Sequence, residues 1–157
     1  MKKIVILLLM ITLSFTFLGC KKEGSTESLK ISNLVFCSEI NGDRDYVEQP
    51  NRTFSADEPV YVYVEVSNLT SKSSGDKLEY WLIFEVEVKD PNGESIIERQ
   101  KIVDQKLQSD SQAPYIYVPI TLTFPEASPK GKYEVFVYAK DGNSERTGTK
   151  SDYFYIE

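Results

Sequence analysis

The sequence predicts an all-β domain in which two antiparallel sheets pack face to face. Beyond residue 28 the chain alternates apolar and polar residues with a period of two, as half-buried strands do. The alternating positions are rich in valine, isoleucine and tyrosine, which favour strands, and no stretch carries the 3.6-residue apolar stripe of an amphipathic helix. Short alternating strands separated by turn-forming residues are typical of a β-sandwich.

Seven strands follow one another along the chain. Their predicted ranges are residues 29–37, 60–68, 78–89, 94–103, 115–124, 132–140 and 151–156. The alternation is clearest in the second strand, where every second residue from Val60 to Val66 is valine. The other strands repeat the pattern with leucine, isoleucine, valine and phenylalanine on one face.

Turn chemistry predicts how these strands are connected. Asp90-Pro91-Asn92-Gly93 indicates a hairpin, because proline presets φ and glycine accepts the positive φ of the turn. Residues 71–76 form a polar loop. Pro119 has no amide hydrogen, so its strand is predicted to lie at a sheet edge or to turn this position away from its neighbour. Residues 38–57 show no clear periodicity, and a short strand near residues 52–54 or a functional loop is expected there.

The first nineteen residues have the features of a secretory signal peptide. Lys2 and Lys3 form a short basic start. The apolar run Ile4–Leu18 that follows is shorter than the roughly 20 residues that cross a hydrocarbon core as a helix. A retained membrane helix is therefore disfavoured.

The apolar run ends in Phe17-Leu18-Gly19-Cys20, which resembles the lipobox of bacterial lipoproteins. The resemblance implies that the Cys20 thiol receives a diacylglyceryl group, that the signal is cleaved before Cys20, and that the new amino terminus is acylated, typically with palmitate. Two or three acyl chains hold a protein at a membrane, because each buried methylene contributes about 0.8 kcal/mol. Lys21 stands where Asp would favour retention in the inner membrane, so the resemblance implies the outer membrane if the organism has one.

Three parts of the chain follow from this interpretation. Residues 1–19 are the signal peptide, residues 20–28 are the lipidated cysteine with a flexible tether, and residues 29–157 are the β-sandwich. The tether has no apolar residue after Cys20, and its shortness holds the domain close to the bilayer on the extracytoplasmic side.

Gly131-Lys132-Tyr133 and the alternating residues after it resemble the corner and penultimate strand of immunoglobulin-like domains. The resemblance implies a single immunoglobulin-like antiparallel β-sandwich in which the Tyr133 hydroxyl bonds back to the backbone. Val135 stands where antibody-type domains have their second cysteine, so no inter-sheet disulfide is expected. Cys37 is predicted to be a small buried residue in or near a strand, and a disulfide with Cys20 is the alternative if Cys20 is not lipidated.

Charge and composition exclude several classes of function. The formal charge of −6 becomes −8 without Lys2 and Lys3, and such a chain offers no basic face for nucleic acid. The chain contains no histidine, which removes histidine-based catalysis and every histidine-ligated metal site. A serine nucleophile would then need a lysine base, and no such pair occurs in a suitable context. The chain is predicted not to be an enzyme.

Acidic residues cluster in two regions. The first consists of Asp43, Asp45, Glu48, Asp57 and Glu58. Two such carboxylates could hydrolyse a glycoside, but acidic residues in a surface loop are usually solvated. Residues 41–45 and 141–145 alternate oxygen ligands as calcium loops do, yet neither has the spacing of an EF-hand. Turns are the preferred interpretation of both segments, and no metal or cofactor is predicted.

Aromatic residues on the polar faces of the strands form the candidate binding surface. The chain has ten tyrosines, and four pairs of rings alternate with apolar residues. The rings are Tyr61, Tyr63, Tyr115, Tyr117, Phe136, Tyr138, Tyr153 and Tyr155. Cross-strand pairing of rings stabilises a sheet without any ligand and is the preferred interpretation. A flat platform for a glycan or an envelope protein is the functional alternative.

These features together predict a lipid-anchored, non-catalytic binding or scaffolding module of the cell envelope, whose ligand the sequence does not name. An accessory or inhibitor domain that acts on an envelope enzyme through its loops is the alternative. A small hydrolase that uses the acidic residues between 43 and 58 is the third hypothesis.

Overall fold

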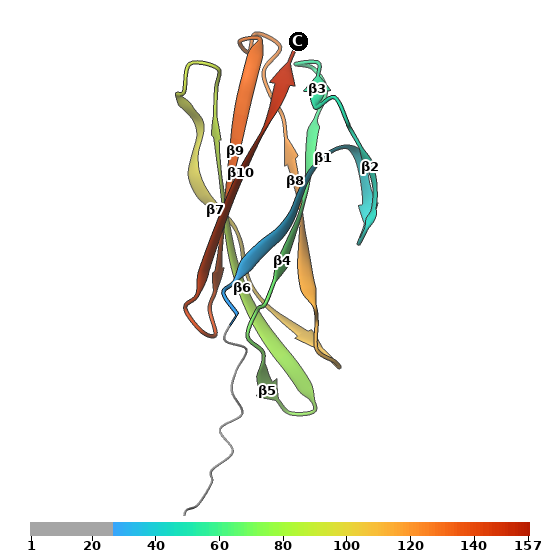
Figure 1. Ribbon diagram of the computed structural model, residues 1–157, viewed down its shortest axis with the longest axis vertical. Coiled ribbons are helices and arrows are strands. Elements are labelled where there is room, and N and C mark those ends of the chain that lie inside the picture. Colours follow the sequence, from blue (N-terminus) through green and yellow to red (C-terminus); the bar gives the residue numbers. More distant parts are fainter. Residues whose placement is uncertain (1–26) are drawn as a thin grey trace, which may run out of the picture.

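The computed structural model describes residues 27–157, which form an all-β sandwich without a helix (Figure 1). The strands are β1 (Lys30–Gly42), β2 (Asp45–Glu48), β3 (Thr53–Phe54), β4 (Val60–Ser67), β5 (Lys72–Ser74), β6 (Lys77–Lys89), β7 (Ser95–Ser109), β8 (Tyr115–Leu122), β9 (Gly131–Asp141) and β10 (Thr147–Ile156). The predicted fold class is confirmed. The signal peptide, Cys20 and most of the tether lie outside the described residues.

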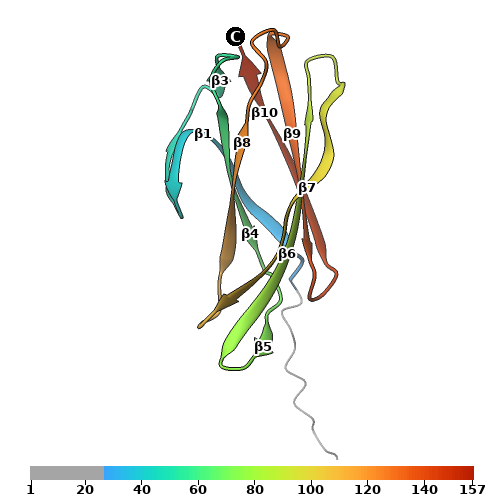
Figure 2. The ribbon, with the colours of Figure 1, turned by 180° about the vertical axis from the view of Figure 1, so that it is seen from behind.

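The strands form two sheets that pack face to face (Figures 1 and 2). The four-stranded sheet has the order β2-β1-β4-β8. The six-stranded sheet runs β3-β10-β9-β6, and both β5 and β7 pair with β6. Neighbouring strands are antiparallel except for β3 and β10, which are parallel. With β1-β4-β8 facing β10-β9-β6-β7, the sandwich is immunoglobulin-like.

All seven predicted strands are present, and three short strands accompany them. The predicted strands correspond to β1, β4, β6, β7, β8, β9 and β10, of which β1 and β7 continue further than expected and β10 begins earlier. β3 is the short strand expected near residues 52–54. β2 and β5 are largely exposed, and an exposed strand needs no apolar alternation, which explains why the sequence pattern gives no sign of them.

An aromatic cluster occupies the core between the sheets. The ring centroid of Phe154 on β10 lies between 5.4 and 5.9 Å from the centroids of four other rings. These rings belong to Phe36, Phe54, Phe124 and Tyr133. The Tyr133 hydroxyl donates a hydrogen bond of 2.7 Å to the carbonyl oxygen of Pro129, so the expected corner is confirmed.

Two further local predictions are confirmed. β8, which contains Pro119, is an edge strand of the four-stranded sheet, where a missing amide hydrogen leaves no gap in a ladder. Cys37 is fully buried in β1 and forms no disulfide with any described residue. Burial raises the pKa of its thiol to about 11, so the thiol stays protonated and unreactive at neutral pH.

Asp141 is the fully buried carboxylate at the end of β9, and protein groups satisfy it. Its oxygens accept hydrogen bonds from the Thr70 amide at 2.8 Å, the Asn143 amide at 2.9 Å and the Ser144 hydroxyl at 2.6 Å. Arg146 pairs with it at 3.3 Å. Burial alone would raise the pKa of Asp141, but these hydrogen bonds outweigh burial and hold the pKa below its ordinary value. Residues 141–145 therefore form a turn, and no metal-binding group of acidic, cysteine or histidine residues occurs between residues 27 and 157.

Replacing Asp141 by asparagine removes the charge on which this network depends. We expect Asp141→Asn to lower the free energy of unfolding by about 2–3 kcal/mol at neutral pH, because buried donors lose their anionic acceptor. The folded state has the lower pKa, so the stabilisation is complete above the ordinary aspartate pKa of about 3.9 and is lost as the pH falls through the folded pKa. Urea unfolding of both proteins across this pH range measures the effect. The exposed Asp76→Asn is the control, and an equal loss there would contradict the assignment.

Candidate binding site

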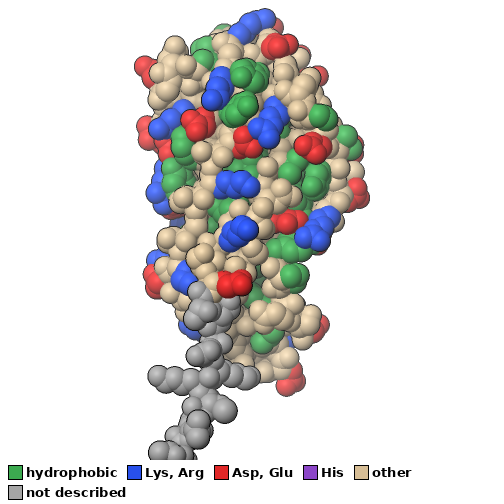
Figure 3. All heavy atoms as spheres, viewed as in Figure 1, with side chains coloured by type: hydrophobic (Ala, Val, Ile, Leu, Met, Phe, Trp, Pro, Cys, Tyr) green, Lys and Arg blue, Asp and Glu red, His purple; other side chains and the backbone are tan. Residues whose placement is uncertain are grey.

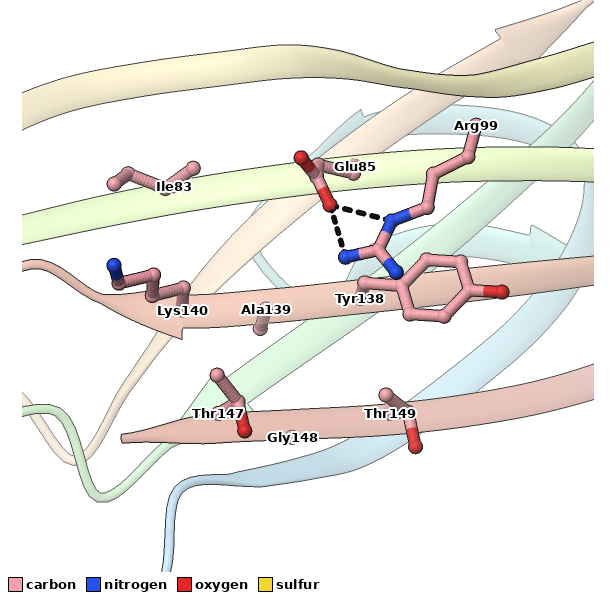
Figure 4. Close-up of a pocket in the computed structure, with 9 residues that line it drawn as sticks. All are labelled: Ile83, Glu85, Arg99, Tyr138, Ala139, Lys140, Thr147, Gly148 and Thr149. Carbon is pink, nitrogen blue, oxygen red and sulfur yellow. Dashed lines mark hydrogen bonds and ion pairs between the residues drawn. The ribbon is translucent and has the colours of Figure 1, made fainter. Parts of the chain in front are cut away.

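A trough of about 310 Å³ lies on the outer face of the six-stranded sheet (Figure 4). Four neighbouring strands, β6, β7, β9 and β10, contribute its walls and floor. The lining residues are Ile83, Glu85, Arg99, Tyr138, Ala139, Lys140, Thr147, Gly148 and Thr149. The site is therefore built on rigid strands and not on loops.

Strand register arranges most of these side chains in two rows across the sheet. Glu85 on β6 pairs in register with Tyr138 on β9, which pairs with Thr149 on β10. The second row joins Ile83, Lys140 and Thr147 in the same way. Residues directly opposite each other on one face of antiparallel strands have neighbouring side chains, so each row presents a continuous line of groups.

Arg99 reaches the first row from β7 and forms one wall of the trough. Its Nε atom donates to Glu85 Oε2 at 2.7 Å, and its guanidinium carbon lies 3.9 Å from the centroid of the Tyr138 ring (Figure 4). The Tyr138 hydroxyl donates to Glu87 at 3.0 Å. Burial and this hydrogen bond to Glu87 raise the pKa of Tyr138, so the hydroxyl keeps its proton and the wall keeps its geometry.

The second wall is formed by Lys140 and two threonines. Lys140 makes an ion pair with Glu145, which lies in the turn after β9. Thr147 and Thr149 are exposed, and their hydroxyls make no hydrogen bond to any of residues 27–157. Figure 4 shows these side chains two positions apart along β10, with Gly148 between them. The floor consists of the Ile83 side chain and the strands around Ala139 and Gly148.

The trough combines matched charges with free hydroxyls. Each of its cations has an acidic partner, since Arg99 pairs with Glu85 and Lys140 pairs with Glu145. Acidic and basic side chains are likewise interspersed, with apolar ones between them, on the side of the molecule where β1 and β10 run (Figure 3). The site can donate and accept hydrogen bonds but has no surplus of either charge with which to hold an ion.

The predicted rings on the four-stranded sheet belong to a self-satisfied cluster. Tyr63 lies on the outer face as expected but is fully buried, with the Tyr46 ring 4.5 Å and the Tyr117 ring 5.6 Å away, centroid to centroid. The hydroxyls of Tyr63 and Tyr115 donate to Asp43 at 3.1 and 3.0 Å. Asp43 of the acidic region is thus an acceptor for tyrosines and holds the β1–β2 turn against the sheet.

Arg44 and Glu65 complete this cluster. Arg44 Nε donates to Glu65 Oε1 at 3.0 Å, and its guanidinium carbon lies 4.2 Å from the centroid of the Tyr115 ring. Burial raises the pKa of Tyr63, so this hydroxyl remains a donor over the whole physiological range. Tyr61, the remaining predicted ring of this sheet, is half-buried on β4.

Cations lie over three of the four predicted rings on the six-stranded sheet, namely Phe136, Tyr138 and Tyr153. The distances from charged atom to ring centroid are 4.9 Å for Lys89 over Phe136 and 4.4 Å for Lys132 over Tyr153. The ring centroids of Tyr153 and Tyr155 lie 5.9 Å apart in an edge-to-face contact. Each of these two residues is about 40% exposed. These contacts support the stabilising interpretation of the rings.

Only Tyr138 of the predicted surface residues lines the trough. The sequence pattern does not single out the other polar groups of the trough, namely Glu85, Arg99, Lys140, Thr147 and Thr149. The sequence does indicate that these residues lie on the outward, polar faces of their strands, because polar and apolar residues alternate there. Their convergence depends on which strands are neighbours, and alternation within one strand carries no such information.

A second, apolar pocket is lined by residues from the start of β7, the loop between β8 and β9, and β9 itself. In Figure 1 these segments lie at the end of the sandwich that carries the C-terminus. Its volume is about 370 Å³, and it lies between the β6–β7 hairpin and the loop that leads from β8 to β9. Its lining is uncharged and includes Ile96, Ile97, Phe124, Pro125 and Tyr133. Ile96 is 46% exposed at the rim.

Comparison with known proteins identifies no family for the chain. No protein-family model and no curated protein matches the chain. The solved structure of the sporulation control protein Spo0M from Bacillus subtilis is similar at 12% identity and a TM-score of 0.43, covering 83% of this chain and 50% of that chain. A Niemann-Pick type C2 protein from Japanese carpenter ant is similar at 10% identity and a TM-score of 0.43, and the match covers 83% of this chain and 94% of that chain. A family 123 glycoside hydrolase from Clostridium perfringens is similar at 9% identity and a TM-score of 0.46, and the match covers 67% of this chain and 22% of that chain.

The chain therefore spans half or less of the length of Spo0M and of the glycoside hydrolase. Similarity at these values carries no argument about function. Between residues 27 and 157 there is also no helix long and apolar enough to cross a membrane.

Proposed function

We propose that the protein is a lipid-anchored, non-catalytic binding module of the cell envelope, and that its trough takes a neutral, hydroxyl-rich segment of a glycan. The observation that carries this proposal is the composition of the trough. Two threonine hydroxyls without a protein partner lie in the same site as charged side chains that already form ion pairs. A sugar hydroxyl is both donor and acceptor, and charged side chains held in place by partners bind it without a net charge on the ligand.

The size and composition of the trough support this ligand class. Binding sites for small ligands are concave, and a volume of about 310 Å³ lies at the lower end of their usual range. Ile83 provides an apolar patch on the floor, against which the C–H face of a sugar ring can pack. The lining contains neither a cysteine nor a serine nucleophile, and its one carboxylate, Glu85, is held by Arg99. This composition favours binding over hydrolysis.

The proposed location depends on the sequence of the first twenty residues. Gly19-Cys20 at the end of an apolar run supports lipidation of Cys20, and Lys21 supports an outer-membrane destination where such a membrane exists. A protein anchored at this site lies beside envelope glycans, which agrees with the ligand class proposed for the trough. An envelope protein is the other possible partner, and no nucleic acid is proposed.

Thr149→Val tests the trough because valine keeps the shape of threonine and removes its hydroxyl. We expect about a tenfold weaker affinity for neutral oligosaccharides from the cell wall, since losing one hydrogen bond costs roughly 1 kcal/mol or slightly more. Isothermal titration of the purified protein with a series of neutral and anionic oligosaccharides measures the affinity. Thr121→Val, at an exposed position on β8 of the other sheet, is the matched control and should bind as the parent does.

Salt separates the proposed ligand from an ionic one. The affinity for a neutral glycan should change little as ionic strength rises, because the interaction involves no net charge. Preferential binding of anionic oligosaccharides with strong salt dependence would contradict a neutral ligand, and equal losses in Thr149→Val and Thr121→Val would contradict the site.

Cys20→Ser tests the anchor. The serine hydroxyl cannot form the thioether, so we expect the variant to remain unprocessed or to leave the membrane fraction. Membrane fractionation combined with mass spectrometry of the N-terminal peptide distinguishes these products. The parent peptide should carry the mass of a diacylglyceryl group, whereas a bare Cys20 thiol with the leader still attached would contradict the anchor.

The apolar pocket favours the second candidate, an accessory or inhibitor domain that contacts an envelope enzyme through its loops. Two connections between strands form this pocket at the end of the sandwich, and exposed Ile96 lies at its rim. If this end binds a protein, Ile96→Ser should reduce co-purification of that protein several-fold and leave glycan binding unchanged. Val47→Ser, at a 50% exposed apolar position on β2, is the control. Unchanged co-purification with both variants would count against this candidate.

A further inference from the structure

β7 presents a long strand edge with which no other described strand pairs. It pairs with β6 along one side over Ser95–Ser109. The other outer strands are less open, because β2, β3 and β5 are short and β8 contains Pro119. Among the described strands, β6 is the one with which β7 pairs.

Only the second half of β7 forms a straight edge. Three register shifts interrupt its pairing with β6 between Phe84 and Lys89, opposite the first half of β7. From Val103 to Ser109 the pairing with β6 is regular, one residue to one. Bulges protect a strand edge from pairing with another chain, so the first half is blocked and the half from Val103 onward is not.

The hydrogen bonds of β6 show which peptide groups of β7 face outward. The carbonyl oxygen of Trp81 accepts from the Gly142 amide at 2.8 Å, on the side of β6 that faces away from β7. Trp81 and its partner Lys106 therefore form a non-hydrogen-bonded pair, in which both residues turn their peptide groups away from each other. Because this direction alternates along a strand, the free peptide groups belong to Asp104, Lys106 and Gln108.

We propose that the free edge of β7 pairs with β7 of a second copy of this chain, antiparallel and centred on Gln105. In this register Gln105 lies opposite Gln105 of the other copy. Asp104 of each copy lies opposite Lys106 of the other, and their outward peptide groups form the backbone hydrogen bonds between the copies. The six-stranded sheets of the two copies then join into one continuous sheet across a two-fold axis.

Charge and side-chain type select this register and this occupant. Centring the pair on Asp104 or on Lys106 would place like charges directly opposite each other, which is destabilising. Centring it on Gln105 gives two Asp104–Lys106 pairs on the outer face, which add to the ion pairs that each chain already makes between Asp104 and Lys101 and between Lys106 and Glu79. On the inner face it sets half-buried Val103 against half-buried Leu107, which extends the apolar layer across the axis. The segment is thus complementary to itself.

The predicted association is weak and reversible. One strand pair of this length covers less surface than the roughly 1,200–2,000 Å² of a stable interface. Membrane anchoring would raise the local concentration, but the pairing itself does not depend on the lipid or on the glycan site.

Cross-linking of full-length protein at the centre of the register tests the proposal. In a non-hydrogen-bonded antiparallel pair the Cα atoms are about 4.5 Å apart, within the range of a disulfide, which is roughly 4.4–6.8 Å. We therefore expect Gln105→Cys to form a covalent dimer on mild oxidation, seen on a non-reducing gel above the background of the parent chain. Gln100→Cys, exposed in the bulged half of the same strand, is the control and should remain largely monomeric. Equal cross-linking at both positions, or none at Gln105→Cys, would overturn the register.

Charge reversal provides a second, independent test in the Gln105→Cys background. Asp104→Lys and Lys106→Asp each set like charges opposite each other, so each variant alone should lose most of its cross-linking. A mixture of the two variants sets Lys opposite Asp at every pair and should recover it, as heterodimers identified by different tags. Reversal of Lys30, which is exposed on the other sheet, should have no effect. Failure of the mixture to recover while both variants unfold like the parent would overturn the proposed charge pairing.

Discussion

The alternation of inward and outward side chains is the constraint on which the rest of this structure depends. β6 and β9 bury every second residue between the sheets, and no disulfide among the described residues assists this apolar layer. A shift of one residue in register would turn buried side chains to solvent, so burial fixes the register as well. The outward rows that line the trough, such as Glu85–Tyr138–Thr149, are therefore placed by the core beneath them.

Cations above the outward rings explain how a surface rich in aromatic residues remains polar. Lys89, Arg99 and Lys132 lie over Phe136, Tyr138 and Tyr153 respectively. Each contact contributes about 0.5–1 kcal/mol at an exposed site and shields one face of its ring from water. A sugar stacks on an open ring face, so these rings act mainly in stabilising the sheet. The proposed glycan site relies instead on hydrogen-bonding groups at the centre of the same sheet.

The sequence predicts what depends on neighbouring residues and misses what depends on distant ones. The edge position of β8 follows from Pro119, and the corner hydrogen bond follows from the sequence around Tyr133. Burial of Tyr63 could not be foreseen, because it requires the β1–β2 turn to fold over β4 and deliver Asp43 to its hydroxyl. The trough escaped prediction for the same reason, since its residues meet only after β6, β9 and β10 become neighbours.

The bulges between β6 and β7 connect the two proposals physically. A bulge changes the direction of side chains and bends a strand. The register shifts around Glu85 occur beside Arg99 of β7, whose guanidinium group lies over the Tyr138 ring. A regular ladder through this region would place the residues of β7 at fixed positions opposite β6 and would keep the whole edge straight. The irregularity thus supplies a wall of the trough, and it leaves the half of β7 from Val103 to Ser109 as the regular edge for the proposed strand pairing. The proposed pairing at that half would leave Arg99 and its contacts untouched, so the proposed glycan binding and the proposed self-association would not compete.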